Sequence, residues 1–149
     1  MIVTALTERG ADMSEQISAS ENNHTLDYYD SHAEEFCTGT MNIEFTAMQN
    51  SFLSKLQAGA YILDFGCGSG RDTKYFLAQG FRVDATDGSS EMCRLAERHT
   101  GINVKCMLFH ELAEQNKYDG IWACSSILHL PAEELADVMG RMAAALKDQ

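Results

Sequence analysis

Three closely spaced glycines follow an apolar run within the segment Tyr61–Asp72, and this pattern determines the local fold. The apolar run predicts a short buried strand that ends in the acid Asp64. Residues 71–79 behind the glycines predict a helix that ends at Gly80. Small residues let a ligand lie against bare backbone, and the helix presents unpaired N–H groups at its N-terminus. Strand, glycine loop and helix together are typical of the opening of a nucleotide-binding βαβ unit.

The spacing of the glycines distinguishes this loop from the dinucleotide signature. That signature, G-x-G-x-x-G, requires a glycine at its sixth position, where this chain has Arg71. The pattern here is D-x-G-x-G-x-G, with Asp64 two residues before the first glycine. A carboxylate at the loop entrance repels a pyrophosphate and attracts an ammonium group. The pattern therefore favours a ligand that carries an ammonium group and disfavours an NAD-type oxidoreductase.

The segment Asp64-Phe-Gly-Cys-Gly-Ser-Gly70 resembles motif I of the class I S-adenosylmethionine (SAM) dependent methyltransferases. The resemblance extends from about Leu26 to the last residue. Within that class the chain looks most like small bacterial methyltransferase-domain proteins, some of them grouped with tellurite-resistance methyltransferases. The resemblance implies an α/β fold, a Rossmann-like doubly wound sheet with strands 1–4 present in the order 3-2-1-4 and later strands missing. It also implies SAM as the cofactor.

An acid stands at the end of the second predicted strand, 81–86, about 20 residues after the glycine loop. There, Asp87 can accept hydrogen bonds from both hydroxyls of a ribose. It can also cap the helix that begins near Ser89, and the two roles are compatible. The cofactor-binding residues implied for this half of the site are Asp64, Gly66, Cys67, Gly68, Gly70, Asp87 and Gly88.

The adenine end of the site is less defined by the sequence. Met92 lies one turn into the helix expected over 90–99, where it either contacts adenine or fills the core. The third strand is expected over 102–108, but the acid that the family places beyond it is missing. Either Glu111 replaces that acid, or backbone groups of Phe109 and His110 contact the adenine.

The fourth predicted strand, Tyr118–Cys124, resembles motif IV of the family. In a doubly wound sheet the ligand lies across the carboxyl ends of the first and fourth strands. Backbone groups of Ala123 and Cys124 are therefore expected beside the methionine part of the cofactor. His129 is a candidate base, but a histidine that fills the boundary between helix and sheet is the simpler interpretation, and no catalytic residue is assigned.

Residues before the first strand divide into two parts. Residues 1–24 are polar and without periodicity, which predicts a mobile tail. Residues 25–57 predict a helical lid before a Rossmann-like core over 58–149, the two forming the N-terminal portion of a SAM-binding domain. Tyr29 either caps the cofactor pocket from this lid or packs on a surface helix.

Composition excludes several classes of function. A formal net charge of -11 is opposite to what a nucleic-acid-binding protein requires. No apolar run is long enough for a membrane span, and no secretory signal is recognisable. The five cysteines are odd in number and lack a C-x-x-C pair, which predicts reduced thiols, a cytoplasmic location and no metal site.

The chain stops where the family continues with a fifth strand. We therefore expect a truncated product, a sheet completed by a second chain, or a half-domain that folds alone. An open edge at the fourth strand would permit a homodimer. The function predicted is methyl transfer from SAM to a small-molecule acceptor, and the alternative is a non-catalytic module or incomplete subunit that binds SAM or S-adenosylhomocysteine.

Overall fold

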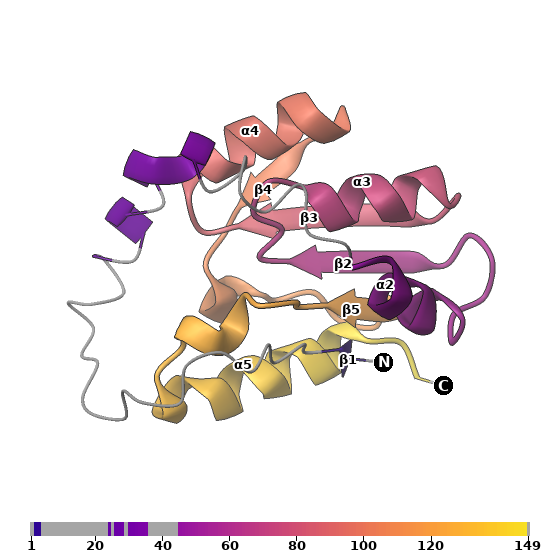
Figure 1. Ribbon diagram of the computed structural model, residues 1–149. Coiled ribbons are helices and arrows are strands. Elements are labelled where there is room, and N and C mark those ends of the chain that lie inside the picture. Colours follow the sequence, from indigo (N-terminus) through magenta and orange to yellow (C-terminus); the bar gives the residue numbers. More distant parts are fainter. Residues whose placement is uncertain (1, 4–23, 25, 29, 36–44, 149) are drawn as a thin grey trace.

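The computed structural model describes residues 2–3, 24, 26–28, 30–35 and 45–148 (Figure 1). Its centre is a parallel sheet in the order β1-β5-β2-β3-β4. The strands are β1 (Ile2–Val3), β2 (Tyr61–Phe65), β3 (Arg82–Asp87), β4 (Val104–Cys106) and β5 (Gly120–Trp122). Strands β4, β3, β2 and β5 are the predicted strands three, two, one and four, so the predicted order 3-2-1-4 is confirmed.

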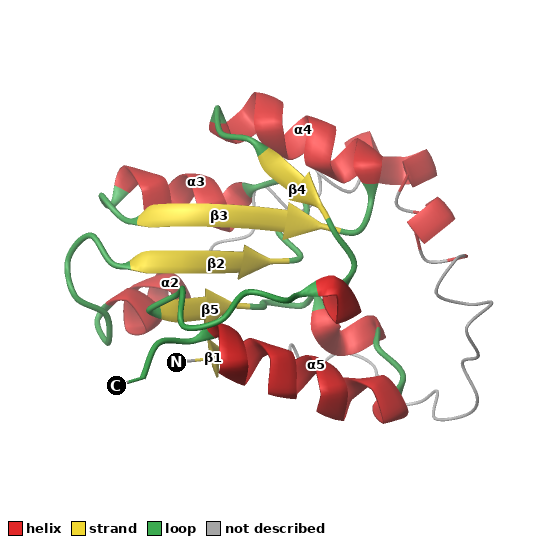
Figure 2. Ribbon diagram, turned by 180° about the vertical axis from the view of Figure 1, so that it is seen from behind, coloured by secondary structure: helices red, strands yellow, loops and turns green. Residues whose placement is uncertain are grey.

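Helices cover both faces of the sheet, and this arrangement makes the fold doubly wound (Figure 2). On one face lie α2 (Thr46–Leu53), α3 (Arg71–Ala78) and α4 (Ser90–Thr100). On the other lies α5 (Ala132–Ala145), together with the short helices η1 (Phe109–Glu111) and η2 (Ile127–His129). Because both faces are covered, β2 and β5 bury apolar residues on both faces and do not alternate between apolar and polar ones.

The central strand β2 shows how one strand supplies two cores. Leu63 and Phe65 pack toward α5, whereas Ile62 packs on the other face. That second core contains an aromatic group in which Trp122 lies 5.2 Å from Phe52 and 5.4 Å from Phe76 between ring centroids. The sheet thus lies between two apolar layers. Because its strands are parallel, the carboxyl ends of β2, β3 and β5 lie at the same edge of the sheet.

The edge predicted to be open at β5 is partly occupied. Ile2 and Val3 pair in parallel with Ile121 and Trp122, so the prediction of an open edge is wrong at these positions. An edge strand exposes unpaired backbone groups, and β-branched apolar residues suit that place. Two residues of the predicted tail 1–24 therefore belong to the sheet, while 4–23 lie outside the described residues.

The first described residues of the predicted lid 25–57, namely 26–28 and 30–35, are helical and lie against the start of α4. Its later part contains α2, which packs on the sheet. The hydroxyl of Ser89 donates a hydrogen bond to the Asp30 carboxylate, and Ala33 packs with Met92 in a small buried cluster. The lid segment is thus placed beside the loop that carries Asp87. No helix in the described part of the chain is long and apolar enough to cross a membrane.

Ser89 is the N-cap of α4, and its hydroxyl accepts a hydrogen bond from Met92 N at 3.2 Å. Because a lost N-cap leaves a helix N–H unpaired, we expect Ser89→Ala to lower the free energy of unfolding by about 1 kcal/mol. Urea unfolding followed by circular dichroism measures this. The control is Ser90→Ala at the adjacent exposed position, and equal effects of the two variants would contradict the assignment.

Candidate cofactor site

The glycine loop joins β2 to α3 and is held against β3 by its backbone. Gly66, Gly68 and Gly70 have φ angles of 81°, 54° and 77°, a region that side chains disfavour. The N–H groups of Gly66 and Cys67 both donate to Thr86 O, at 2.9 and 2.8 Å. The loop therefore folds back over the end of β3.

Gly66 also lacks a side chain because its neighbours leave no room for one. A Cβ placed there would overlap the side chain of Ser126 and lie 3.3 Å from Phe109 Cζ. Ser126 is itself anchored, since its hydroxyl donates to Phe65 O at 2.6 Å. The segment after β5 thus closes directly onto the glycine loop.

Asp64 at the end of β2 is 2% exposed, and its carboxyl group accepts a 2.5 Å hydrogen bond from the Thr73 hydroxyl. Burial and the nearby Asp72 together raise the pKa of Asp64 to about 8, while the bond from Thr73 opposes the rise. The protonated acid is therefore favoured at neutral pH. The sequence does not reveal Thr73 as a partner, although it is a polar residue on the inner face of α3.

The raised pKa of Asp64 predicts a pH dependence of stability. An acid whose folded pKa lies above its ordinary value stabilises the fold at low pH, and that contribution is lost between pH 3.8 and about 8. We expect the free energy of unfolding of the wild type to fall relative to Asp64→Asn across this window. Urea titrations at several pH values measure the difference, and parallel profiles for the two proteins would refute the prediction.

A second buried carboxylate, Asp72, lies one residue from Arg71 and ties three elements together. It accepts hydrogen bonds from Gln49 Nε2 at 2.6 Å, from Trp122 Nε1 at 2.9 Å and from the Arg71 guanidinium at 2.9 Å. The same guanidinium lies 4.0 Å over the ring of Phe45. This network fixes α2, α3 and β5 under the glycine loop, and sequence reasoning did not identify it.

Asp87 ends β3 and connects the two loops of the site. Its carboxylate accepts from Gly68 N and from Ser89 N, each at 2.9 Å. Burial raises the pKa of Asp87, and the bonds from the Ser89 and Gly68 backbones oppose that rise. The carboxylate thus spans the glycine loop and the start of α4, as an acid that serves both a ligand and a helix end would.

The surroundings of Gly88 and Met92 are apolar. A Cβ on Gly88 would lie 3.1 Å from Leu26 Cδ2 and 3.3 Å from Leu108 Cδ2. Met92 is 2% exposed and packs with Ala33, which places it in the core between α4 and the lid. The two leucines were not among the predicted site residues.

The Glu111 side chain bonds to the backbone at the start of its own short helix. Its carboxylate accepts a 2.7 Å hydrogen bond from Leu108 N and caps η1, so one of its two oxygens bonds within this short helix. His110 is exposed. Phe109 instead packs edge-on against Phe65 at 4.8 Å, which places η1 beside the end of β2.

Ala123 and Cys124 follow β5 directly. Ala123 is fully buried, while the Cys124 thiol lies 3.8 Å from the Ser125 hydroxyl. Ser125 has a φ of 58°, and this turn in the left-handed region directs the chain to Ser126 above the glycine loop. The backbone at 123–126 therefore adjoins the loop, where the topology of a doubly wound sheet places a ligand.

Two predicted residues cannot be located. Tyr29 and the side chain of His129 lie outside the described part of the structure. No group of three or more His, Cys, Asp or Glu side chains among the described residues is arranged to hold a metal ion.

A family model described as "Methyltransferase domain" matches residues 62–149, which begin in β2 and include the glycine loop and Asp87. The chain belongs to the methyltransferase-domain family. This confirms the predicted family, the class I SAM-dependent methyltransferases. The cofactor predicted from motif I is supported as well, because several similar structures were solved with SAM or S-adenosylhomocysteine.

Individual relatives of this methyltransferase domain are similar over part of their length. The chain is 36% identical over 95 residues to N-terminal Xaa-Pro-Lys N-methyltransferase 1 of Xenopus tropicalis, covering 58% of this chain and 42% of that protein. Its fold matches 1,6-didemethyltoxoflavin-N1-methyltransferase of Burkholderia thailandensis, solved with S-adenosylhomocysteine, with a TM-score of 0.72 and 25% identity. That match covers 91% of this chain and 63% of the other.

A protein named for a different activity has a similar fold. The [4+2]-cyclase SpnF matches with a TM-score of 0.66 at 17% identity, over 83% of this chain and 56% of that chain. This methyltransferase domain therefore spans less than two thirds of the length of each of these three relatives.

Proposed function

We propose that this chain binds SAM between the glycine loop and the end of β3, and that it transfers the methyl group to a small-molecule acceptor. The observation that carries the proposal is the link between the two predicted acids. The Asp87 carboxylate holds Gly68 N at 2.9 Å, and Asp64 is close enough to Asp87 for their charges to interact. An amino-acid nucleoside bound at these loops would therefore have one of the two carboxyl groups near each of its ends.

The residues present fit the chemistry of SAM. Its sulfonium supplies an electrophilic methyl group, so the chain has to bind the cofactor, orient the acceptor and exclude water. Asp64 would attract the α-ammonium group directly or through water, and Asp87 would accept the ribose hydroxyls. The bare backbone of 66–70 would admit the methionine part against 123–126. A general base is required only for an acceptor that keeps its proton at neutral pH.

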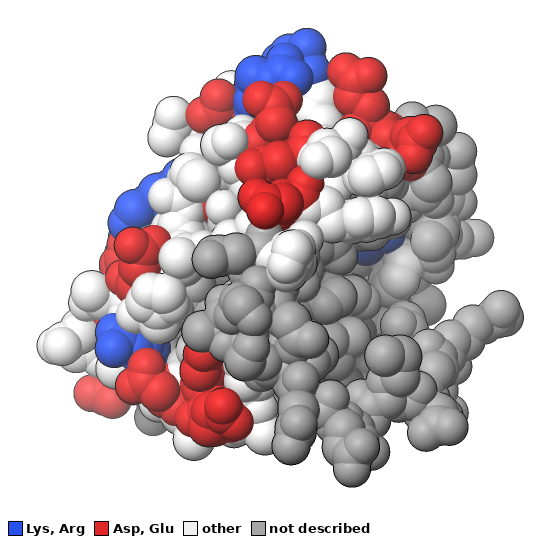
Figure 3. Space-filling model, turned by 90° about the vertical axis from the view of Figure 1, so that its left-hand side faces the viewer, with Lys and Arg blue, Asp and Glu red and all other residues white. Residues whose placement is uncertain are grey.

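Charge and similarity both favour a small acceptor over a nucleic acid. The net charge is -11, and on the face shown in Figure 3 the described Lys and Arg side chains lie apart while acidic groups are widespread. The Burkholderia relative was solved with the small molecule 1,6-didemethyltoxoflavin. The Xenopus relative is named for a peptide N-terminus, which makes a terminal amine the second acceptor class to test.

A binding module without turnover is the alternative function. The [4+2]-cyclase SpnF shares this fold at 17% identity, so the fold by itself does not establish methyl transfer. Calorimetry with SAM, S-adenosylhomocysteine and NAD tests the ligand first. Binding of NAD without SAM would overturn the proposal.

Turnover then separates enzyme from module. The chain is incubated with SAM and a panel of small amines, hydroxyaromatic and heteroaromatic acceptors and a peptide beginning Xaa-Pro-Lys, and formation of S-adenosylhomocysteine is measured. Product with a small molecule supports the proposal. Product with the peptide alone would replace the small-molecule acceptor by a peptide N-terminus. Binding of SAM without product from any acceptor in the panel would favour the binding module.

A further inference from the structure

Two cysteines from different elements meet beside the loop that carries Asp87. Cys93 lies on α4 and donates from its thiol to Asp87 O at 3.4 Å. Cys106 ends β4 and donates to Gly88 O at 3.7 Å. The two thiols are also close enough to each other to interact electrostatically. Consecutive carbonyl groups of one loop therefore bring both sulfur atoms to the same place.

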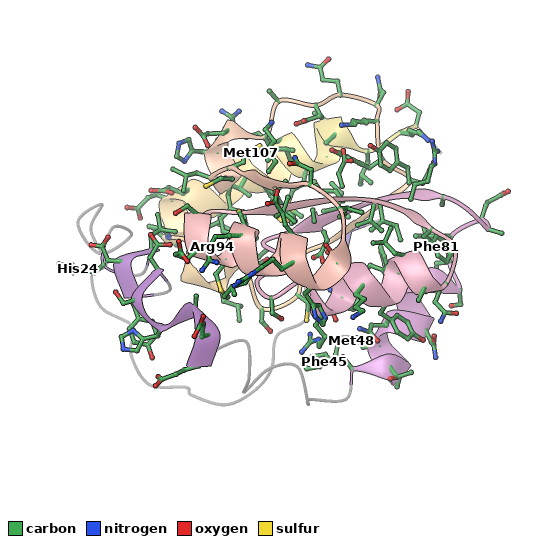
Figure 4. All side chains as sticks on the ribbon, turned by 90° about the horizontal axis from the view of Figure 1, so that it is seen from above. His24, Phe45, Met48, Phe81, Arg94 and Met107 are labelled. Atoms are coloured by element: carbon green, nitrogen blue, oxygen red, sulfur yellow. The ribbon has the colours of Figure 1, made fainter. Side chains whose placement is uncertain are left out.

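The backbone next to Cys106 also bonds to this loop. Figure 4 labels Arg94, which follows Cys93 on α4, and Met107, which follows Cys106 at the end of β4. Met107 N donates to Asp87 O at 2.9 Å, the oxygen that also accepts from Cys93. Backbone and side-chain bonds thus hold β4 and α4 together across the loop.

The two thiols differ in access. Cys93 is 5% exposed, and burial together with the negative charge of Asp87 raises its pKa to about 12. Cys106 is exposed. A reagent in solution therefore reaches Cys106 first, while Cys93 is held next to it and shielded.

We propose that Cys93 and Cys106 form a dithiol site that reacts with a low-molecular-weight disulfide, such as oxidised glutathione, and closes to an intramolecular disulfide. In the first step the Cys106 thiolate attacks one sulfur of the reagent, which releases one thiol and leaves a mixed disulfide on Cys106. In the second step Cys93 loses its proton and attacks Cys106 Sγ, which releases the second thiol. The protein loses two hydrogen atoms, and the reagent gains them as two thiols.

Proximity compensates for the low acidity of Cys93. An attacking group held next to its target reacts as if it were present at very high concentration, so a small thiolate fraction is sufficient for closure. Of the other described cysteines, Cys124 bonds to Ser125 after β5, and Cys67 bonds to Gly68 O within the glycine loop. Cys67 packs against the cluster that contains Cys93, which makes it the alternative partner to exclude.

Oxidation would act on the cofactor site because both thiols bond to its loop. Closing the disulfide removes two hydrogen-bond donors from Asp87 O and Gly88 O and ties α4 directly to β4. We expect the affinity for SAM to change severalfold on oxidation and to return on reduction. An unchanged affinity would overturn the link between this dithiol and the cofactor site, whether or not turnover is detected.

The test uses the full chain, reduced and then incubated with oxidised glutathione. After the remaining thiols are blocked, non-reducing peptide mass spectrometry identifies the linkage. We expect a Cys93–Cys106 disulfide, which Cys106→Ser abolishes and Cys124→Ser leaves in place. In Cys93→Ser the exposed Cys106 should accumulate as the mixed disulfide with glutathione.

Three outcomes would overturn the proposal. The first is a linkage of Cys93 to Cys67, which Cys67→Ser would abolish. The second is a wild type that stops at the mixed disulfide on Cys106. The third is a protein in which both thiols remain free. None of these outcomes depends on whether the chain transfers a methyl group, so the dithiol and the proposed function fail separately.

Discussion

The variant Asp87→Ala should bind SAM roughly tenfold to more than a hundredfold more weakly than the wild type. A charge-assisted hydrogen bond contributes about 1.5–3 kcal/mol, and the carboxylate is proposed to hold the ribose. The carboxylate also supports the site without a ligand, since it accepts from Gly68 N and Ser89 N at 2.9 Å. Calorimetry with SAM measures the change.

Two further variants make the result specific to Asp87. Asp87→Asn keeps one carbonyl oxygen for the backbone bonds, so its affinity should lie between those of the wild type and the alanine variant. Asp137→Ala removes an exposed carboxylate that pairs with Arg141 on α5, and its affinity should equal that of the wild type. Equal affinities for all four proteins would exclude the ribose role.

Replacing Gly66 with alanine should lower the free energy of unfolding by about 2–5 kcal/mol. The first part of this effect is the φ of 81°, which costs a residue with a Cβ about 1–2 kcal/mol. The second part is overpacking, at about 1–3 kcal/mol, because the new methyl group would overlap the Ser126 side chain. Urea unfolding followed by circular dichroism measures the loss, and SAM affinity should fall with it.

Gly80→Ala is the matched control for Gly66→Ala. Gly80 has a φ of 85°, and a Cβ added there meets no atom within 4 Å. This variant should therefore show only the conformational part of the cost, about 1–2 kcal/mol. If the two variants were equally destabilised, the close approach of Ser126 to the glycine loop would not contribute.

The sequence predicts those parts of the fold and site that depend on local patterns. The strand before Gly66, the glycine loop and the helix behind it are neighbours in the chain. They carry the resemblance to the family, and that resemblance implied the strand order and the cofactor. Thr73 and Asp72 were missed because their roles depend on Asp64 and Trp122 in three dimensions. Polar residues on a helix resemble surface residues until the sheet beneath them is known.

Two other departures have similar causes. The pairing of Ile2 with Ile121 joins positions far apart in the sequence, so no local pattern indicates it. The bond between the Glu111 carboxylate and Leu108 N was not expected from the sequence either, and the adenine contact of Glu111 stays a prediction. Homodimer formation remains a prediction, although β5, the edge expected to mediate it, pairs with β1. A cytoplasmic location and the capping role of Tyr29 also remain predictions.

Trp122, the single tryptophan of the chain, provides a built-in optical probe. Its indole is fully buried among Phe52 and Phe76, and its N–H bonds to Asp72 beneath the glycine loop. Emission from this one fluorophore therefore reports on the interior next to the ligand loop, without contributions from other indoles. Rearrangement of the loop by a bound nucleoside, or loosening of α2 from the sheet, should be visible as a change in wavelength or intensity in unlabelled protein.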